Sequence, residues 1–100
     1  MPAYVIVDVH IHNPDGYAAY RQLSGPSVEQ YGGRFIVRGG AVEVVEGDWQ
    51  PTRLVVIEFP SMEQARAWYT SPEYTEARRV RLGAADFKMI FIEGVEAPQR

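Results

Sequence analysis

The segment Ala3–His12 constrains the fold more than any other part of the sequence. It reads Ala-Tyr-Val-Ile-Val-Asp-Val-His-Ile-His, and every odd position from Val5 to Ile11 is a β-branched apolar residue. Successive side chains of a strand point to opposite faces, so this segment predicts a strand with one entirely apolar face.

A helix is predicted directly after this strand. Asn13 supplies a capping side chain, Pro14 suits the first helical position, and Asp15 places an acid near the positive end of the helix. Its expected buried stripe consists of Tyr17, Tyr20 and Leu23.

The same helix is expected to be interrupted at Ser24-Gly25-Pro26, because proline has no amide proton and clashes with the preceding turn. A second short segment, 27–31, should then end at Gly32-Gly33, where a left-handed cap costs least.

The rest of the chain alternates strand and helix signals. Further strands are predicted at 34–38, 53–59 and 87–92, with extended chain at 41–45 after a bulge or bend at Gly39-Gly40. The second strand, 34–38 with its extended continuation at 41–45, is expected to form a hairpin with 53–59 around a turn-rich connection. Helix start signals at Ser61 and Ser71-Pro72 predict two consecutive helices, the second running to about Leu82.

The order strand, helix, strand, strand, helix, strand is that of ferredoxin-like domains. It predicts an α+β fold, βαββαβ, with a four-stranded antiparallel sheet that carries its helices on one face. We expect one domain over residues 1–95, followed by a polar tail at 96–100 that frays.

The second face of this sheet predicts the assembly. Its side chains come from even positions and are too apolar to face water: Tyr4, Ile6, Ile36, Leu54, Val56, Ile90 and Ile92. The simplest cover is the same face of a second copy, which gives a homodimer built as a dimeric α/β barrel. Trp49, beside the predicted turn, is a candidate for contact with that partner.

Composition excludes several function classes. The chain has no cysteine, which removes disulfides, thiolate nucleophiles and zinc sites of the cysteine type, and suits a reducing cytoplasm. Its 10 basic and 13 acidic residues are interspersed and leave a net charge of −3, so a nucleic-acid partner is not expected. No apolar run approaches the ~20 residues of a membrane span and no basic stretch stands before the first strand, so neither a membrane span nor a leader is expected.

Asp8, His10 and His12 should lie on one face of the first strand, about 6.5–7 Å apart in succession. A carboxylate and two imidazoles in a row can act as an acid–base pair or ligate a metal. The plainer alternative is that Asp8 and His10 satisfy each other while His12 lies at the strand end. We predict no metal site, since ligands on a flat strand diverge without a third element.

Arg38 and Glu58 share the even parity of Asp8 on strands expected to lie nearby. Desolvating an unpaired charge is costly, so the first expectation is an ion pair of Arg38 with Glu58 or Asp8. The functional alternative makes Arg38 an anchor for a carboxylate or enolate oxygen, which its planar fork can bind through two hydrogen bonds.

Aromatic residues are numerous on the predicted helices. At helical spacing they are most simply core, yet tyrosine hydroxyls need partners, and an apolar pocket with a few polar tips is the usual form of a small-ligand site. The candidates for its walls are Tyr17, Tyr20, Trp68 and Tyr74.

Five segments together resemble the bacterial family known as domain of unknown function 1330. These are Tyr4–Val7, Pro14–Tyr17, Gly32–Gly40, Val56–Ser61 and Trp68–Tyr74. The resemblance extends from Ala3 to Val95 and implies the dimeric α/β-barrel superfamily, which includes cofactorless monooxygenases, muconolactone isomerase-like enzymes and haem-binding chlorite dismutase-like proteins. It implies no particular reaction, because fold kinship alone does not assign chemistry.

The sequence therefore predicts a small cytoplasmic homodimer that binds an aromatic or polyketide-like molecule and oxidises or isomerises it without metal or other cofactor. In this hypothesis Asp8 and His10 transfer protons and Arg38 anchors an oxyanion. The ligand-binding residues would be Tyr17, Tyr20, Glu58, Trp68 and Tyr74. The alternative is a non-catalytic ligand-binding or assembly module. A haem protein would need an axial histidine on the helix side, whereas parity directs His10 to the other face.

Overall fold

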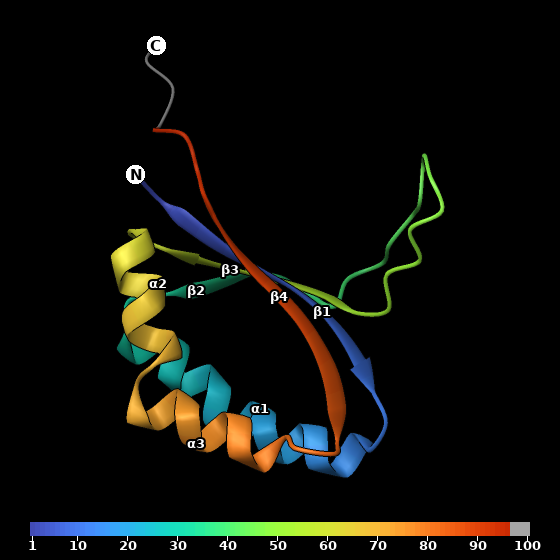
Figure 1. The fold of residues 1–100 in the computed structure, drawn as a ribbon, viewed down its shortest axis with the longest axis horizontal. Helices are drawn as coiled ribbons and strands as arrows, with labels where there is room; N and C mark the ends of the chain where they lie inside the picture. Colours follow the sequence, from blue (N-terminus) through green and yellow to red (C-terminus); the bar gives the residue numbers. More distant parts are fainter. Residues whose placement is uncertain (97–100) are drawn as a thin grey trace.

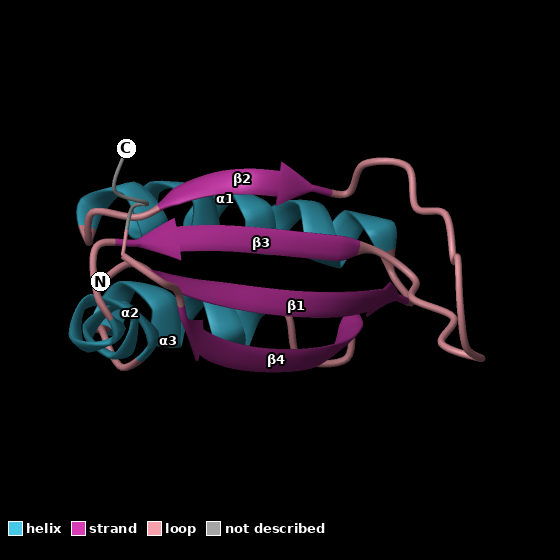
Figure 2. Ribbon diagram, turned by 90° about the horizontal axis from the view of Figure 1, so that it is seen from above, coloured by secondary structure: helices cyan, strands magenta, loops and turns pink. Residues whose placement is uncertain are grey.

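One antiparallel sheet carries all the helices on one of its faces (Figures 1 and 2). The computed structural model describes residues 1–96, so the predicted tail, beyond Glu96, lies outside the described residues. Within that range the elements in chain order are β1 (Ala3–Ile11), α1 (Pro14–Gln30), β2 (Arg34–Arg38), β3 (Leu54–Phe59), α2 (Met62–Tyr69), α3 (Pro72–Val80) and β4 (Ala85–Glu93).

The strand order is β2-β3-β1-β4, and each neighbouring pair is antiparallel. The two longest strands, β1 and β4, pair along their whole length, from Ala3 with Glu93 to Ile11 with Ala85. This topology confirms the predicted ferredoxin-like α+β fold with a four-stranded sheet in residues 1–96.

The core lies between the sheet and the helices. On β1 the odd residues Val5, Val7 and Val9 are at most 3% exposed, as the alternation predicted. Trp68 of α2 and Tyr74 of α3 pack onto this side and are 1% and 0% exposed. Burial of these side chains contributes to the hydrophobic stabilisation of the domain.

Side chains cap the helices where the sequence indicated. The Asn13 side chain accepts hydrogen bonds from the amides of Asp15 and Gly16 at the start of α1. Ser61 and Ser71 do the same for α2 and α3, each accepting from the amide three residues later, at 3.1 Å. These bonds satisfy amides that have no partner within the helix.

Helix α1 differs from the prediction in two ways. It continues through Pro26 to Gln30 instead of restarting, because its second half is held by packing: the Ser27 hydroxyl donates to the Ser24 carbonyl and accepts from the Trp68 indole. Leu23, predicted to be buried, is 40% exposed, and Ser24, Ser27 and Val28 occupy the inner face instead.

Residues 39–53 form an arm that projects from the end of the sheet (Figure 1). The predicted hairpin of the second and third strands is present between Arg34–Arg38 and Leu54–Phe59, but the predicted extended segment 41–45 is not a strand. The chain leaves the sheet at Gly39, whose φ of 73° is left-handed and whose amide still donates to Leu54. The residues that would lie opposite 41–45 precede Leu54, where β3 starts. Segment 41–45 therefore has no neighbouring strand to pair with.

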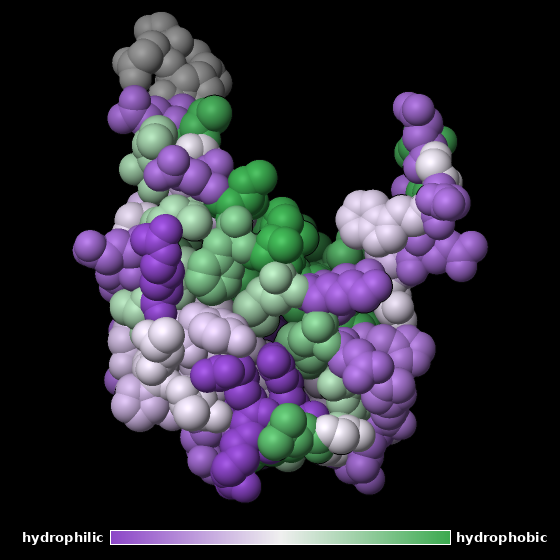
Figure 3. All heavy atoms as spheres, viewed as in Figure 1, coloured by the Kyte–Doolittle hydropathy of each residue, from purple (hydrophilic) through white to green (hydrophobic). Residues whose placement is uncertain are grey.

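The other face of the sheet is open and apolar, as predicted. Ile6 of β1 lies between its cross-strand partners Val56 and Ile90, and Ile90 and Ile92 are 57% and 49% exposed. Figure 3 shows the hydrophobic surface that this face presents between the arm and the end of β4. We call it the open face.

Candidate functional site

A bulge in β2 determines which residues reach the space under the sheet. Arg34 pairs with Glu58 and Phe35 with Ile57, but then Val37 pairs with Val56 and Arg38 with Val55, so one extra residue lies on β2. An inserted residue reverses the facing of those that follow. Arg34 therefore lies on the open face and Arg38 on the helix side, although both have even numbers.

A narrow cavity lies between the sheet and α1, partly open to solvent. Its volume is about 20 Å³, enough for a water-sized guest. Its walls are mostly apolar and include the predicted Tyr17, Tyr20, Trp68, Tyr74 and Arg38; the other lining residues are Val7, Val9, Arg21, Ser24, Val28, Phe35, Arg53, Val55, Ile57, Phe87 and Met89. A larger guest requires some of the lining side chains to move.

Two tyrosines and an arginine form a hydrogen-bonded chain at the cavity wall. The hydroxyls of Tyr20 and Tyr74 lie 2.7 Å apart, and Arg81 donates to the Tyr74 hydroxyl at 3.0 Å. Burial raises the pKa of both phenols above the usual value. Both therefore stay neutral near pH 7. One hydroxyl proton forms the bond between them and the other can be donated, but neither phenol serves as a base.

Trp68 lines the cavity with its ring but has no unpaired hydrogen-bonding group. Its indole N–H donates to the Ser27 hydroxyl at 3.0 Å, and its ring packs against Tyr74, with centroids 4.0 Å apart, and against Phe59. With its N–H already paired, the ring can offer a flat guest only its apolar surface.

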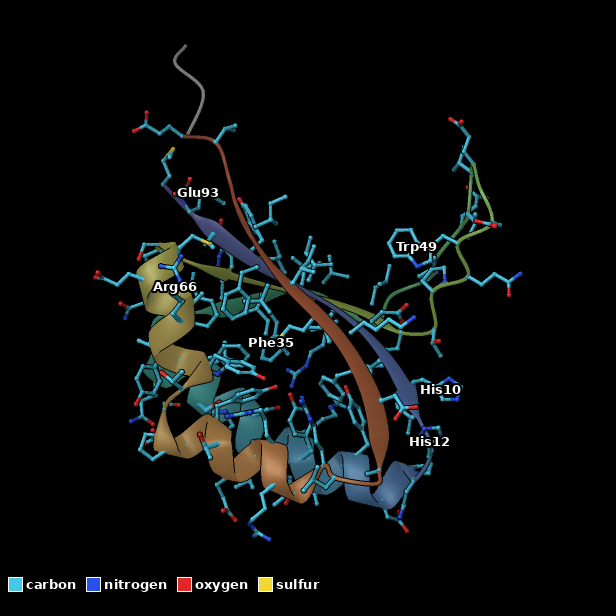
Figure 4. The ribbon with its side chains drawn as sticks, in the orientation of Figure 1. His10, His12, Phe35, Trp49, Arg66 and Glu93 are labelled. Atoms are coloured by element: carbon cyan, nitrogen blue, oxygen red, sulfur yellow. The ribbon has the colours of Figure 1, made fainter. Side chains whose placement is uncertain are left out.

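Two arginines lie at the mouth of the cavity over aromatic rings. The Arg38 guanidinium is 4.0 Å from the centre of the Phe35 ring, and that of Arg53 is 5.8 Å from the Tyr17 ring. Figure 4 shows Phe35 between the sheet and the helices. These stacked cations are planar hydrogen-bond donors beside an apolar hollow.

Asp8 and His10 lie on the opposite side of the sheet from this cavity. They border a separate, polar hollow with Gln50, Thr52, Asp86 and Lys88. The Asp8 carboxylate accepts from the Thr52 amide at 2.9 Å, while His10 is exposed and contacts the His12 ring edge to face. Figure 4 shows His10 and His12 near the end of β1, away from Phe35. The predicted set Asp8, His10 and Arg38 is thus divided between two faces of one chain.

The expected ion pair of Arg38 with Glu58 or Asp8 is absent from the described residues, because the bulge turns Arg38 to the helix side. Arg34 takes its place and donates to Glu58 at 2.7 Å. The Tyr4 hydroxyl donates to the other oxygen of Glu58. Glu58, predicted to bind ligand together with Tyr17 and Tyr20, belongs to this open-face cluster and does not line the cavity.

Among residues 1–96, no group of three or more histidine, aspartate or glutamate side chains is arranged to hold a metal ion. His12, the third member of the predicted row, is hydrogen-bonded to Asp86 at 2.8 Å. A membrane span is likewise not found: in the part of the chain described here, no helix has the length and apolar character to cross a bilayer.

Sequence reasoning missed Arg53 and Arg81. Arg53 precedes β3 and shares the odd parity of Val55 and Ile57, a signal that could have placed it on the helix side. Arg81 follows α3 and reaches Tyr74 only because α3 packs beside α1, a contact that the sequence pattern does not specify.

Comparison with solved structures shows the same fold elsewhere. The RPA0582 protein of Rhodopseudomonas palustris, of unknown function, is 25% identical, with a TM-score of 0.68 and coverage of 96% of this chain and 84% of that one. SnoaB of Streptomyces nogalater, a cofactor-independent oxygenase, is 8% identical (TM-score 0.65; 96% and 95% covered). A dimeric protein of unknown function from Bacteroides fragilis is 9% identical (TM-score 0.56; 93% and 96% covered).

Fold and topology thus define a ferredoxin-like α+β domain of a type found in both an oxygenase and a dimeric protein. The chain belongs to the family described as domain of unknown function (DUF1330), whose sequence model matches residues 2–95. No curated protein matches it.

Proposed function

We propose that the protein is a cytoplasmic homodimer that binds a small, flat, largely apolar molecule in the cavity between its sheet and its helices. The cytoplasmic location is proposed because the chain has no cysteine. The observation that carries the ligand proposal is the cavity, with the Tyr20–Tyr74 hydroxyl pair set in aromatic walls. Apolar concave sites with few, well-placed polar groups are the common form of small-molecule sites.

Binding is better supported than turnover. Deprotonating a substrate in the cavity needs a base, and its lining residues include neither a carboxylate nor a histidine. Asp8 and His10 lie beyond the sheet, so within one chain they do not reach a guest beside Arg38. Metal-free oxidation or isomerisation stays our second proposal, for a substrate that enters already ionised and whose oxyanion Arg38 and the tyrosine hydroxyls stabilise.

The homodimer is proposed from the open face. Exposed Ile90 and Ile92 adjoin half-buried Ile6 and Val56, a surface too apolar to remain in water. The dimeric protein from Bacteroides fragilis shares this fold. Trp49 is 61% exposed, and Figure 4 shows it on the arm beside the space above the open face, where a second copy would contact it.

Titration calorimetry with naphthoate and naphthamide tests the cavity, and native mass spectrometry of the same sample tests the dimer. We expect a dimer that binds at least one of these flat compounds. Met89→Trp, at a half-buried lining position, should fill the cavity and abolish binding, whereas Met62→Trp on α2, also half-buried but outside the cavity, should retain it.

Failure of both compounds to bind the wild-type protein would refute the ligand proposal. Equal loss of binding in Met62→Trp and Met89→Trp would place the guest elsewhere. A monomer in the mass spectrum would refute the homodimer while leaving the cavity result unaffected.

A further inference from the structure

Three arginine side chains lie around the cavity, although the protein is acidic overall. Arg21, Arg38 and Arg53 all line it, although the chain has a net charge of −3. Within residues 1–96 the ion pairs are made by His12, Arg34 and Arg79, so none of these three cavity arginines is paired with a carboxylate. The positive potential there is therefore not neutralised by the protein itself.

Arg53 is the member of this group that is held in place. Its carbonyl accepts from the Val9 amide at 2.9 Å, which fixes the backbone beside β1. Its side chain is half-buried over Tyr17, and its Nε is fully buried without a hydrogen-bond partner among the described residues. A buried donor without an acceptor costs free energy, which an acceptor from a ligand would lower. The Nε of Arg78, which does not line the cavity, is the other such atom among the described residues.

The backbone makes room for this guanidinium at one position. A Cβ at residue 39 would overlap the guanidinium of Arg53, so any side chain there would displace it. Gly39 also has a left-handed φ of 73°. Gly40, next to it, has open space around its Cβ position. Gly39 therefore forms a turn and also leaves the space that the Arg53 guanidinium occupies; we call this space the seat of Arg53.

Arg38 reaches the same mouth from the neighbouring strand. Its Nη2 lies 3.6 Å from the Cβ position of Gly25 on α1, so the side chain spans the gap between β2 and the helix. It lies on the same face as Arg53, diagonally across the β2–β3 pair. Two planar guanidinium groups then face one opening from adjacent strands.

We propose that the ligand is a flat organic anion whose carboxylate or enolate oxygen is bound by Arg53 and Arg38, with Gly39 as the positioning residue that seats Arg53. The inference rests on the proposed function, since it assigns the ligand class of the same cavity. The apolar body of the anion lies against Tyr17 and Trp68, and its charged end stays at the mouth. A guanidinium binds a carboxylate through two parallel hydrogen bonds, which accounts for the use of arginine rather than lysine.

Naphthoate and naphthamide test this inference because they share shape and differ in charge. We expect the wild-type protein to bind naphthoate at least about tenfold more tightly, a preference that weakens with added salt. Arg53→Gln should lower naphthoate affinity much more than naphthamide affinity and so reduce the preference at least about threefold. Arg34→Gln, which removes an arginine from the opposite face of β2, should change neither affinity.

The seat is tested by Gly39→Ala against Gly47→Ala. Both glycines have a left-handed φ, 73° and 84°, so both substitutions strain the backbone, but only residue 39 contacts an arginine. We expect Gly39→Ala to lower naphthoate affinity about as much as Arg53→Gln does, and naphthamide affinity less. Gly47→Ala should bind both compounds as the wild type does.

The outcomes separate the two proposals. If both compounds bind with equal affinity, the cavity takes a neutral guest and the anion inference is wrong while the proposed function stands. If the wild type prefers naphthoate and Arg53→Gln keeps that preference, the carboxylate is bound by other residues and the inference is also wrong. If neither compound binds, the proposed function fails together with it.

Discussion

The two faces of the sheet use the same strands for different purposes. On the helix side Val5, Val7 and Val9 are nearly inaccessible, and aromatic residues with buried hydroxyls complete the layer. On the open face apolar side chains stay half-exposed, and charges gather in pairs near the strand ends, as Arg34 does with Glu58. The contrast teaches that parity along a strand decides whether a residue contributes to core, cavity or interface, and that a single bulge can reassign it.

The largest expected effect is on the helix side. Trp68→Ala should lower the free energy of unfolding by about 3–5 kcal/mol, because it empties a fully buried site and leaves the Ser27 hydroxyl without a donor. Urea denaturation measures it. Leu82→Ala, which removes a large apolar side chain from a 77% exposed position after α3, should cost less than about 1 kcal/mol. Equal losses would contradict the buried role of Trp68.

A charge on the open face should break the assembly and leave the fold intact. Ile90→Asp is expected to raise the dimer dissociation constant at least about a hundredfold, about 3 kcal/mol, because it buries an unpaired carboxylate between two copies. Ile90 is 57% exposed in the single chain, so circular dichroism should be unchanged. Analytical ultracentrifugation measures the dissociation. Leu82→Asp, at a 77% exposed position after α3, should leave the dimer as it is.

Loss of a single hydroxyl should separate the two faces more finely. Tyr74→Phe should destabilise the fold by about 2 kcal/mol, because it leaves buried Tyr20 and Arg81 without their shared partner. Tyr4→Phe removes a hydroxyl that donates to Glu58 on the open face, where Glu58 keeps its hydrogen bond from Arg34. Its cost in the same denaturation experiment should be below about 1 kcal/mol. Similar values for the two variants would contradict the contrast between the faces.

The smallest expected effect concerns the outer surface of the helix layer. Hydrogen bonds from its own backbone amide and from the Tyr31 hydroxyl lower the pKa of Glu73 below its ordinary value of 4.5. A lowered folded-state pKa stabilises the fold above pH 4.5, and that contribution is lost as the pH falls through the folded value.

Urea denaturation at about pH 6 and about pH 3 tests this contribution. The wild type should lose more stability between these conditions than Glu73→Gln. Tyr31→Phe, which removes one of the hydrogen bonds that lower this pKa, should fall between them. An identical acid-side loss in Glu73→Gln and wild type would show that this carboxylate does not contribute.

The sequence by itself determined the strand and helix order, the capping residues and the two-sided sheet. These follow from local rules: β-branched alternation in Ala3–His12, asparagine or serine before each helix, and a second apolar set at even positions. The cavity residues Tyr17, Tyr20, Trp68 and Tyr74 were also predictable, because their spacing places them on the inner faces of the helices.

Tertiary structure decided the rest. Packing of Ser27 against Trp68 carries α1 through Pro26, and the absence of a neighbouring strand leaves 41–45 unpaired. The bulge after Phe35 places Arg38 on the cavity side and Arg34 beside Glu58 on the open face. Strict alternation would place both arginines on the open face. Bulges and long-range contacts depend on residues distant in the chain, and local sequence patterns carry no information about them. For that reason the elements could be predicted from the sequence, while the membership of the site required the folded chain.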